Sequence, residues 1–326
     1  MSAQSTTPLL SVRNLRTYFF TYRGVVHAVE DVDLDINRGE VVGLVGETGC
    51  GKTCTALSTM RLIQEPGRIL TGEVLLEGKD LLKVEEKEMR SVRGSKIAMI
   101  FQNPTAALNP VFNVGDQIIE MIMLHKNLDK AKAKDEAERW IKATGIPSPH
   151  ERLSHYPHEF SVGMRQRIMI AIALSCQPSL LIADEPTTGL DVTTQAQILD
   201  LLAELKAQHD MSILYITHNL GVVAQICDRV GVMYAGGIVE FADVRTIFKK
   251  PWHPYTEGLI KALPTRFTVD QDLVEIPGTV PSLVNLPEGC PFSDRCYRMR
   301  EDCKIKRPVL TELEPGHFVS CYCPAR

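Results

Sequence analysis

Between Gly46 and Thr53 the sequence reads Gly-Glu-Thr-Gly-Cys-Gly-Lys-Thr, which fits the pattern G-x-x-x-x-G-K-[ST]. The segment follows the apolar run Val41 to Val45 and precedes a helix-like stretch, the setting that such a loop requires. Its glycines allow positive φ, so that successive N–H groups and the next helix N-terminus can face phosphate oxygens. The alternative is a chance glycine turn before a helix. The complete match in this setting favours a phosphate-binding loop.

The side chains of the loop predict a nucleotide site that also holds a magnesium ion. Lys52 supplies a point charge to the β- and γ-phosphates, and the Thr53 hydroxyl is a ligand for Mg²⁺. By itself, this loop is compatible with kinases, GTPases, helicases and motor ATPases. The nucleotide-binding residues expected here are Gly46, Glu47, Thr48, Gly49, Cys50, Gly51, Lys52 and Thr53.

An apolar strand that ends in two acidic residues narrows this range. Residues 180–185 read Leu-Leu-Ile-Ala-Asp-Glu, so Asp184 and Glu185 follow directly after a buried run. Their positions predict that Asp184 holds Mg²⁺ and that Glu185 polarises an attacking water.

Two further polar residues also follow apolar strands. Gln102 comes after the run Ile97 to Ile100 and offers an amide to the metal or the water, whereas His218 follows Ile213 to Thr217 and can reach a γ-phosphate. Taken singly, a histidine after a strand is a common turn residue, and a glutamine before Asn-Pro is a common loop amide. The sequence thus predicts catalytic roles for Glu185, His218 and Gln102, and magnesium ligation by Thr53, Gln102 and Asp184.

The segment Phe160-Ser-Val-Gly-Met-Arg-Gln-Arg167 opens a helix shortly before the acidic strand. Here the sequence resembles the ATP-binding cassette (ABC) family, whose signature is usually Leu-Ser-Gly-Gly-Gln. In that family, the signature faces the γ-phosphate bound by a second subunit, which implies nucleotide contacts for Ser161 and Gly163. Val162 stands where the family has its first glycine, and Met164 also departs from the pattern. A helix N-cap at Ser161 is a compatible interpretation.

The resemblance covers residues 8–250, and Gly189-Leu190-Asp191 completes it as the family's D-loop. It implies an α/β fold: a P-loop NTPase core of the ABC ATPase type, with an antiparallel β-subdomain and a helical subdomain at about 103–175. Alternating apolar and acidic residues at 31–36 predict a strand of the β-subdomain. The expected helices are Val114 to His125, Lys130 to Thr144, Thr193 to Gln208 and Asn219 to Cys227.

An aromatic residue near the N-terminus completes the nucleotide site implied by the resemblance. Phe19 lies five residues after Asn14, where the family places a side chain that stacks on adenine. Tyr18 and Tyr22 are neighbours that could substitute. Aromatic residues in strands are also common core residues, so this interpretation remains open.

Composition is consistent with one cassette and an appendage. The chain has 326 residues, 44% of them hydrophobic and 23% charged, with a net charge of −4. That charge argues against non-specific nucleic-acid binding, for which a basic footprint is expected. No apolar run reaches the roughly 18 residues of a transmembrane helix, and residues 1–10 lack a signal-peptide pattern. We therefore expect the chain to stay in the cytoplasm, and the resemblance implies a peripheral position on the cytoplasmic face of the cell membrane.

The tail, defined as residues 251–326, forms the expected small cysteine-rich C-terminal extension. Without an export signal its cysteines are expected to be reduced, so they are better interpreted as ligands than as disulfides. Together with His253-Pro254-Tyr255, they resemble the extension of dipeptide and oligopeptide importer ATPases, some of which hold a [4Fe–4S] cluster. Zinc and free thiols are the alternatives. The implied ligands are Cys290, Cys296, Cys303 and Cys321, with Cys323 left over.

The other four cysteines lie in apolar or helical settings and are predicted to be small packing residues. They are Cys50, Cys54, Cys176 and Cys227.

The segment Phe101-Gln-Asn-Pro104, followed by Ala107-Leu-Asn-Pro110, also resembles the peptide-importer branch. That resemblance implies ATP and Mg²⁺ as cofactors, a second and related ATPase subunit, two transmembrane permeases and an extracytoplasmic substrate-binding protein. Nickel and glutathione importers have similar ATPases. A soluble cassette ATPase acting on ribosomes or DNA is the alternative from another class, although such proteins usually carry two cassettes or a long coiled coil.

Overall fold

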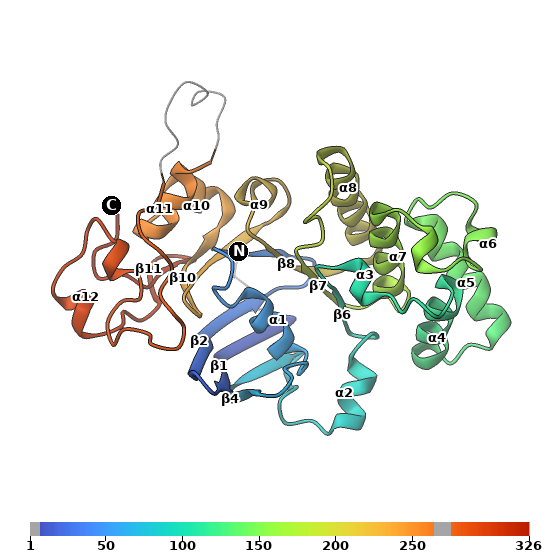
Figure 1. Ribbon diagram of the computed structural model, residues 1–326, viewed down its shortest axis with the longest axis horizontal. Helices are drawn as coiled ribbons and strands as arrows, with labels where there is room; N and C mark the ends of the chain where they lie inside the picture. Colours follow the sequence, from blue (N-terminus) through green and yellow to red (C-terminus); the bar gives the residue numbers. More distant parts are fainter. Residues whose placement is uncertain (1–6, 264–274, 326) are drawn as a thin grey trace, which may run out of the picture. The chain divides into compact units, whose positions relative to one another are not determined.

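The computed structural model describes residues 7–263 and 275–325, so residues 1–6, 264–274 and Arg326 lie outside the described part of the chain. The chain divides into two compact units (Figure 1). The first contains Met1–Ile36, Val41–Leu82 and Tyr215–Arg326, and the second contains Asn37–Glu40 and Lys83–Leu214. The boundary runs through strand β8 (Ser212–Thr217), whose last three residues belong to the first unit.

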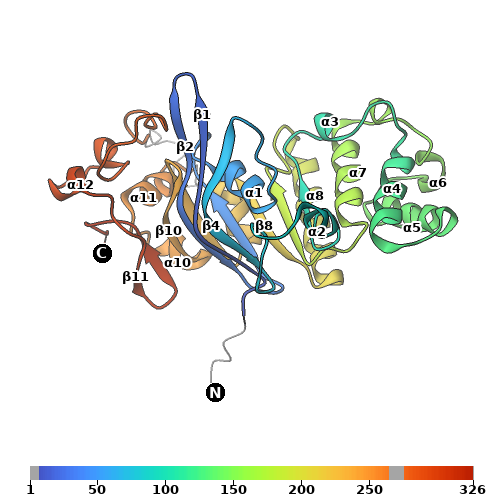
Figure 2. The same ribbon diagram turned by 90° about the horizontal axis from the view of Figure 1, so that it is seen from below.

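An antiparallel sheet in the order β2-β1-β4-β5 occupies the N-terminal part of the first unit (Figure 2). Its long hairpin pairs Leu10 with Ile36, and the apolar residues at 32, 34 and 36 are buried whereas the aspartates between them are not. The alternation predicted at 31–36 is therefore confirmed. The strands are β1 (Leu10–Thr21), β2 (Gly24–Ile36), β4 (Gly67–Leu76) and β5 (Lys79–Asp80).

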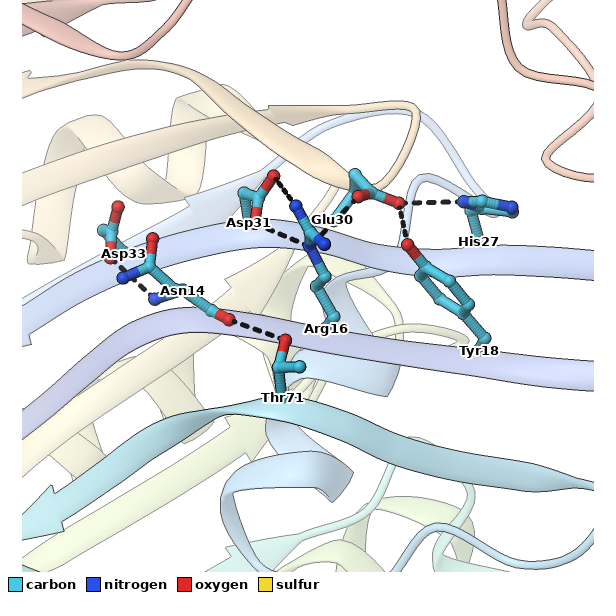
Figure 3. A network of polar contacts seen from close by, with 8 residues as sticks. All are labelled: Asn14, Arg16, Tyr18, His27, Glu30, Asp31, Asp33 and Thr71. Carbon is cyan, nitrogen blue, oxygen red and sulfur yellow. Dashed lines mark hydrogen bonds and ion pairs between the residues drawn. The ribbon is translucent and has the colours of Figure 1, made fainter.

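A polar network covers one face of this hairpin (Figure 3). Arg16 makes two hydrogen bonds to Asp31, at 2.7 and 2.8 Å, and lies 3.3 Å from Glu30. Glu30 also accepts a 2.7 Å hydrogen bond from the Tyr18 hydroxyl and lies 2.9 Å from His27 Nδ1. These contacts engage the acidic residues that alternate with the apolar ones, and they fix the position of Tyr18.

A second group of strands in the first unit runs in the order β3-β9-β10-β12-β11. The central strand β3 (Val41–Val45) is buried along its whole length and pairs in parallel with β9 (Arg229–Tyr234), as its continuous apolar sequence predicts. β9 then pairs antiparallel with β10 (Gly237–Asp243). The phosphate-binding loop follows β3, and α1 (Lys52–Thr59) follows the loop.

The tail contributes strands to this same group. β12 (His317–Val319) pairs antiparallel with β10, and β11 (Thr311–Glu314) pairs with β12 (Figure 2). The tail is therefore part of the first unit and not a separate body. Its helices and those before it are α9 (Leu220–Ile226), α10 (Val244–Lys249), α11 (Pro254–Lys261), η2 (Ser293–Arg295) and α12 (Asp302–Ile305).

The second unit is mainly helical and carries two parallel strands, β6 (Ile97–Ile100) and β7 (Leu180–Asp184). Helices α3 to α7 gather in one part of this unit (Figure 1). Five of its helices begin at a side-chain cap, and the capping residues are Asn103, Asn113, Asp129, Ser161 and Asp191. Its helices are α2 (Glu86–Val92), α3 (Pro104–Ala107), α4 (Val114–Lys126), α5 (Lys130–Ala143), α6 (Pro149–Arg152), η1 (Pro157–Glu159), α7 (Val162–Leu174) and α8 (Val192–His209).

The four helices predicted from sequence agree with α4, α5, α8 and α9 to within one residue at each end. Within residues 7–263 and 275–325, the structure contains no helix long and apolar enough to cross a membrane.

Candidate active site

The phosphate-binding loop adopts the backbone conformation that its glycines allow. Gly46 has a φ of 155° and Gly51 a φ of 109°. A Cβ at Gly46 would lie 2.1 Å from the Met233 carbonyl oxygen, and one at Gly51 would lie 2.2 Å from that of Ala28. Any side chain would collide with backbone at both positions, so the loop depends on glycine there.

The loop is folded around its own lysine. Lys52 is 5% exposed, and its Nζ donates to the carbonyl oxygens of Gly46 and Glu47, at 2.8 and 3.1 Å. The N-cap residue of α1 is Gly51, which has no side-chain oxygen to accept from the first N–H groups of the helix. Such N–H groups bind anions, so the loop and helix start retain donors suited to phosphate.

His218 lies beside this loop, as its position after β8 predicts. A cavity of about 240 Å³ is lined by Val45, the loop residues 46–48, His218, Leu220 and Leu259. The histidine and the phosphate loop therefore face a common space within the first unit. Leu259, from α11, is a part of this lining that sequence reasoning missed.

Gln102 and Glu185 lie together in the second unit. β6 pairs with β7 so that Ile100 aligns with Ala183, and this register places the residues after both strands at one edge. Glu185 Oε2 accepts hydrogen bonds from Gln102 Nε2 at 3.0 Å and from Thr188 Oγ1 at 2.9 Å. Sequence reasoning expected each residue to act on the metal or the water, and the direct contact between the two side chains is an addition from the structure.

The backbone at the acidic strand end is strained. Glu185 has a φ of 46°, a left-handed conformation that is uncommon for residues other than glycine. Asp184, the last residue of β7, is 3% exposed. Strain of this kind is found at active sites, where surrounding contacts hold a side chain in a required direction. The conformation points the Glu185 carboxylate toward Gln102 and Thr188.

The signature segment forms the start of α7. The Ser161 hydroxyl accepts from Met164 N at 3.3 Å and caps the helix, as predicted. Val162 is the first residue of α7, with 48% of its surface exposed. Its backbone is helical and does not lie in the left-handed region that favours glycine, so a side chain is compatible with the backbone at this position. A Cβ at Gly163 would lie 2.9 Å from Thr194 Cγ2, so this glycine allows α7 to approach α8 closely.

The aromatic candidates for adenine stacking differ in their surroundings. Phe19 is half-buried in β1, where its ring would be 2.6 Å from a Cβ at Gly67. The ring of Tyr18 packs against that of His27 in a tilted arrangement, with the ring centroids 4.1 Å apart, whereas Tyr22 is 91% exposed. The Tyr18 side chain is thus held by protein contacts, and stacking by Phe19 stays a prediction.

Of the four cysteines outside the tail, two are buried as expected for packing residues. Cys50 is fully buried and Cys227 is 6% exposed. Burial raises the pKa of the Cys227 thiol to about 12, so it is neutral at physiological pH. Cys54 and Cys176 are partly exposed.

The tail cysteines do not form the ligand group that was predicted. All five are free thiols, and among the described residues no group of three or more side chains is arranged to hold a metal ion. Burial is the main cause that raises the pKa of Cys290 to about 11 and that of Cys321 to about 12. Neighbouring tail cysteines add to both shifts, which places the thiols near one another. Cys290 and Cys321 are therefore neutral thiols close to other tail cysteines, and the arrangement does not support the predicted [4Fe–4S] cluster.

Sequence reasoning missed two residues that contact the phosphate-binding loop from farther along the chain. The Glu47 N–H donates to the hydroxyl of Tyr255 at 2.9 Å, and the Glu47 carboxylate pairs with Arg295. Tyr255 belongs to the His-Pro-Tyr motif, which was noted only as a family resemblance. No local pattern distinguishes Arg295 from the other arginines of the tail.

These parts together define an ATPase of the ATP-binding cassette class: a glycine loop after a buried parallel strand, a glutamate held by glutamine after an acidic strand, and a serine-capped signature helix. Residues 29–188 match the family model "ABC transporter". Residues 239–303 match the model "Oligopeptide/dipeptide transporter, C-terminal region".

Curated relatives resemble the chain over almost its whole length. It is 47% identical to the oligopeptide transport ATP-binding protein OppD of Escherichia coli, over 99% of this chain and 96% of the relative. It is 48% identical to the dipeptide transport ATP-binding protein DppD of Bacillus subtilis, over 96% of this chain and 94% of the relative. The chain belongs to the family of ATP-binding proteins of oligopeptide and dipeptide ABC transporters.

A solved structure confirms the fold. The structure of cbiO1 from Clostridium perfringens, part of the ABC transporter complex cbiONQ, has a TM-score of 0.63 at 26% identity. The match covers 74% of this chain and 91% of that one.

Proposed function

We propose that the chain is the ATP-hydrolysing subunit that powers import of dipeptides or oligopeptides across the cytoplasmic membrane. The observation that carries this proposal is the whole-chain likeness to peptide transport ATP-binding proteins, which includes both the cassette and the C-terminal region. Peripheral association with a membrane complex, on its cytoplasmic face, follows from that assignment.

The hydrolytic chemistry is assigned to the residues of the sequence motifs, taken one motif at a time. Main-chain N–H groups of the loop and the Lys52 ammonium bind the phosphates. Glu185 orients and deprotonates the attacking water, and the Gln102 amide holds its carboxylate in place. Mg²⁺, when bound, neutralises charge on the phosphates. The hydroxyl, amide and carboxylate oxygens of Thr53, Gln102 and Asp184 are ligands of the type that this ion prefers.

The segment from Phe101 to Phe112 is suited to a membrane partner. Val111 and Phe112 are 72% and 53% exposed, and Phe101 is 41% exposed. These apolar side chains lie in the segments before α4, and Gln117 ties that segment down by donating to the Phe112 carbonyl at 3.1 Å. Exposed apolar residues held in a fixed loop are characteristic of a docking site. We assign this surface to a transmembrane permease.

The composite ATP site requires a second cassette, which we propose to be a related but different chain. In such an arrangement, each phosphate-binding loop faces the signature segment of the other subunit. The departures at Val162 and Met164 support a partner whose own signature differs from this one. An extracytoplasmic binding protein and the permeases then select the peptide.

Iron–sulfur ligation by Cys290, Cys296, Cys303 and Cys321 is a separate proposal. Its support is the grouping of the thiols within one tail, where they influence each other's pKa. Within the described part of the chain these thiols are not arranged as a metal-binding group, and the hydrolytic roles given above involve none of them. Iron analysis of anaerobically purified protein tests it: about four irons per chain support it, and a colourless protein without iron contradicts it.

Affinity purification from a detergent extract tests the main assignment. We expect two polytopic membrane proteins and a second cassette ATPase to co-purify. Phe112→Asp should release the membrane proteins, whereas Ile305→Asp, at a 70% exposed position of the tail, should retain them. Recovery of ribosomal or DNA-bound proteins in place of membrane proteins would contradict the assignment.

A further inference from the structure

The tail holds the phosphate-binding loop at its second residue, Glu47. The Arg295 guanidinium binds the Glu47 carboxylate through two contacts, Nη1 to Oε2 at 2.8 Å and Nη2 to Oε1 at 3.2 Å. Tyr255 adds a third contact, because its hydroxyl accepts from the Glu47 N–H at 2.9 Å. A two-point contact between arginine and carboxylate fixes direction as well as distance.

Arg295 is itself held in place on several sides. Its side chain is 5% exposed, compared with 31% for that of Glu47. Nε donates to the Pro277 carbonyl at 2.9 Å, and Nη1 also donates to the Tyr234 hydroxyl at 3.3 Å. The guanidinium is therefore already positioned by the tail and by β9, and it does not depend on Glu47 for its orientation.

An aromatic cluster of three rings supports these contacts. The rings of Tyr234 and Tyr255 lie 4.6 Å apart, and both pack against Phe292, at 5.3 and 5.5 Å. Tyr234 ends β9, Tyr255 lies in α11, and Phe292 precedes the 3₁₀ turn that carries Arg295. The cluster joins three separate chain segments into one rigid support beneath the loop.

The negative charge of Glu47 determines how the contact with Arg295 affects nucleotide binding. Glu47 lies within a loop whose N–H groups are aimed at phosphate, so an unpaired carboxylate there would repel a nucleotide triphosphate. Lys52 contacts the Glu47 carbonyl oxygen and is the cation reserved for the phosphates. The second cation, Arg295, offsets the carboxylate without occupying the loop.

We propose that Arg295 is a positioning residue of the ATP site: it neutralises Glu47 and fixes the start of the phosphate-binding loop in its binding conformation. The inference deepens the proposed function, because it rests on this loop binding ATP. It gives the tail a defined part in nucleotide affinity. The tail lies far from the loop in sequence, yet its arginine contacts the loop directly.

The test measures ATP affinity of the full chain by titration with a fluorescent ATP analogue in the presence of Mg²⁺. Arg295→Ala should weaken binding about tenfold, which corresponds to about 1.4 kcal/mol. The double variant Arg295→Ala with Glu47→Gln should recover at least about threefold of that loss, since it removes the unpaired charge. Arg300→Ala, an exposed arginine of the same tail, controls for the change in net charge.

The charge rescue separates a positioning role from a structural one. If Arg295→Ala only loosened the tail, adding Glu47→Gln would not restore affinity, and that result would overturn the proposal. Unchanged affinity in Arg295→Ala would overturn it too, even if the variant stays folded by circular dichroism. If the wild-type chain binds no ATP, the proposed function fails first. If the wild-type chain binds ATP and Arg295→Ala binds it with the same affinity, this inference is refuted while the proposed function stands.

Discussion

Replacing Glu185 by glutamine tests the assignment of the catalytic base. In the structure, Oε2 of Glu185 accepts from both Gln102 Nε2 and Thr188 Oγ1. Glutamine has nearly the same shape, so its amide oxygen can still accept from these donors. Its NH₂ group replaces the second carboxylate oxygen and cannot take a proton from water. The change therefore removes basicity and preserves most of the local packing.

The expected effect is large for hydrolysis and small for binding. Loss of a positioned base typically costs about 10²- to 10⁴-fold in rate, or roughly 3 to 5 kcal/mol of activation free energy. ATP affinity should remain close to that of the wild type, because Glu185 supplies no phosphate-binding donor. The assay is phosphate release by the assembled complex at saturating ATP, with affinity measured separately on the full chain.

Glu204→Gln, at an exposed position in α8, is the matched control and should keep wild-type turnover. Wild-type turnover in Glu185→Gln would refute the role given to Glu185 and the interpretation of its left-handed backbone as functional strain. A loss of both binding and hydrolysis would refute the separation of their roles.

Three further predictions address the loop, the signature and the tail. Lys52→Ala should weaken ATP binding in the same titration, and unchanged affinity would contradict the role of its ammonium. If the partner cassette is a related chain, Glu185→Gln should lower the ATPase activity of the complex more than the equivalent change in the partner. Val162→Gly should reduce the difference between these two losses of activity. Equal losses from the two glutamate variants would show that the two ATP sites are equivalent. Burial lowers the pKa of His253 from 6.5 to about 4. The unfolded chain therefore takes up a proton at a higher pH than the folded chain does. As the pH falls from 6.5 to 4, the free energy of unfolding should decrease by roughly 3 kcal/mol. His253 Nδ1 caps α11 by accepting from Tyr255 N at 3.1 Å, so His253→Asn, which keeps a cap acceptor, should remove much of this pH dependence in urea unfolding.

The parts of the site that sequence predicts are those that depend on local pattern. The phosphate-binding loop needs glycine at fixed spacing, and the acidic residues follow a recognisable buried strand. Gln102 and Glu185 are each predicted as site residues that follow an apolar strand, whereas their contact is seen only in the structure, where β6 pairs with β7. Helix bounds were also close, since Ser, Asn and Asp caps mark their starts.

The parts that sequence did not predict depend on contacts between distant segments. Arg295 lies 248 positions from Glu47, and nothing in its neighbourhood indicates that it pairs with the loop. The pairing of β12 with β10 likewise joins the tail to the first unit, and β12 is a strand of only three residues, too short for its sequence to indicate a partner. The cysteine spacing indicates only which thiols could be ligands, whereas their arrangement depends on how the tail folds, and among the described residues they form no metal-binding group.

The central claim is that ATP hydrolysis by this chain drives peptide import. The most direct measurement is accumulation of a labelled tripeptide by proteoliposomes that contain the chain, its permeases and the binding protein, with ATP supplied on the side of the cassettes. We predict ATP-dependent accumulation with the wild type and none with Glu185→Gln. Accumulation that persists in Glu185→Gln, or transport of nickel or glutathione but not of peptide, would contradict the account.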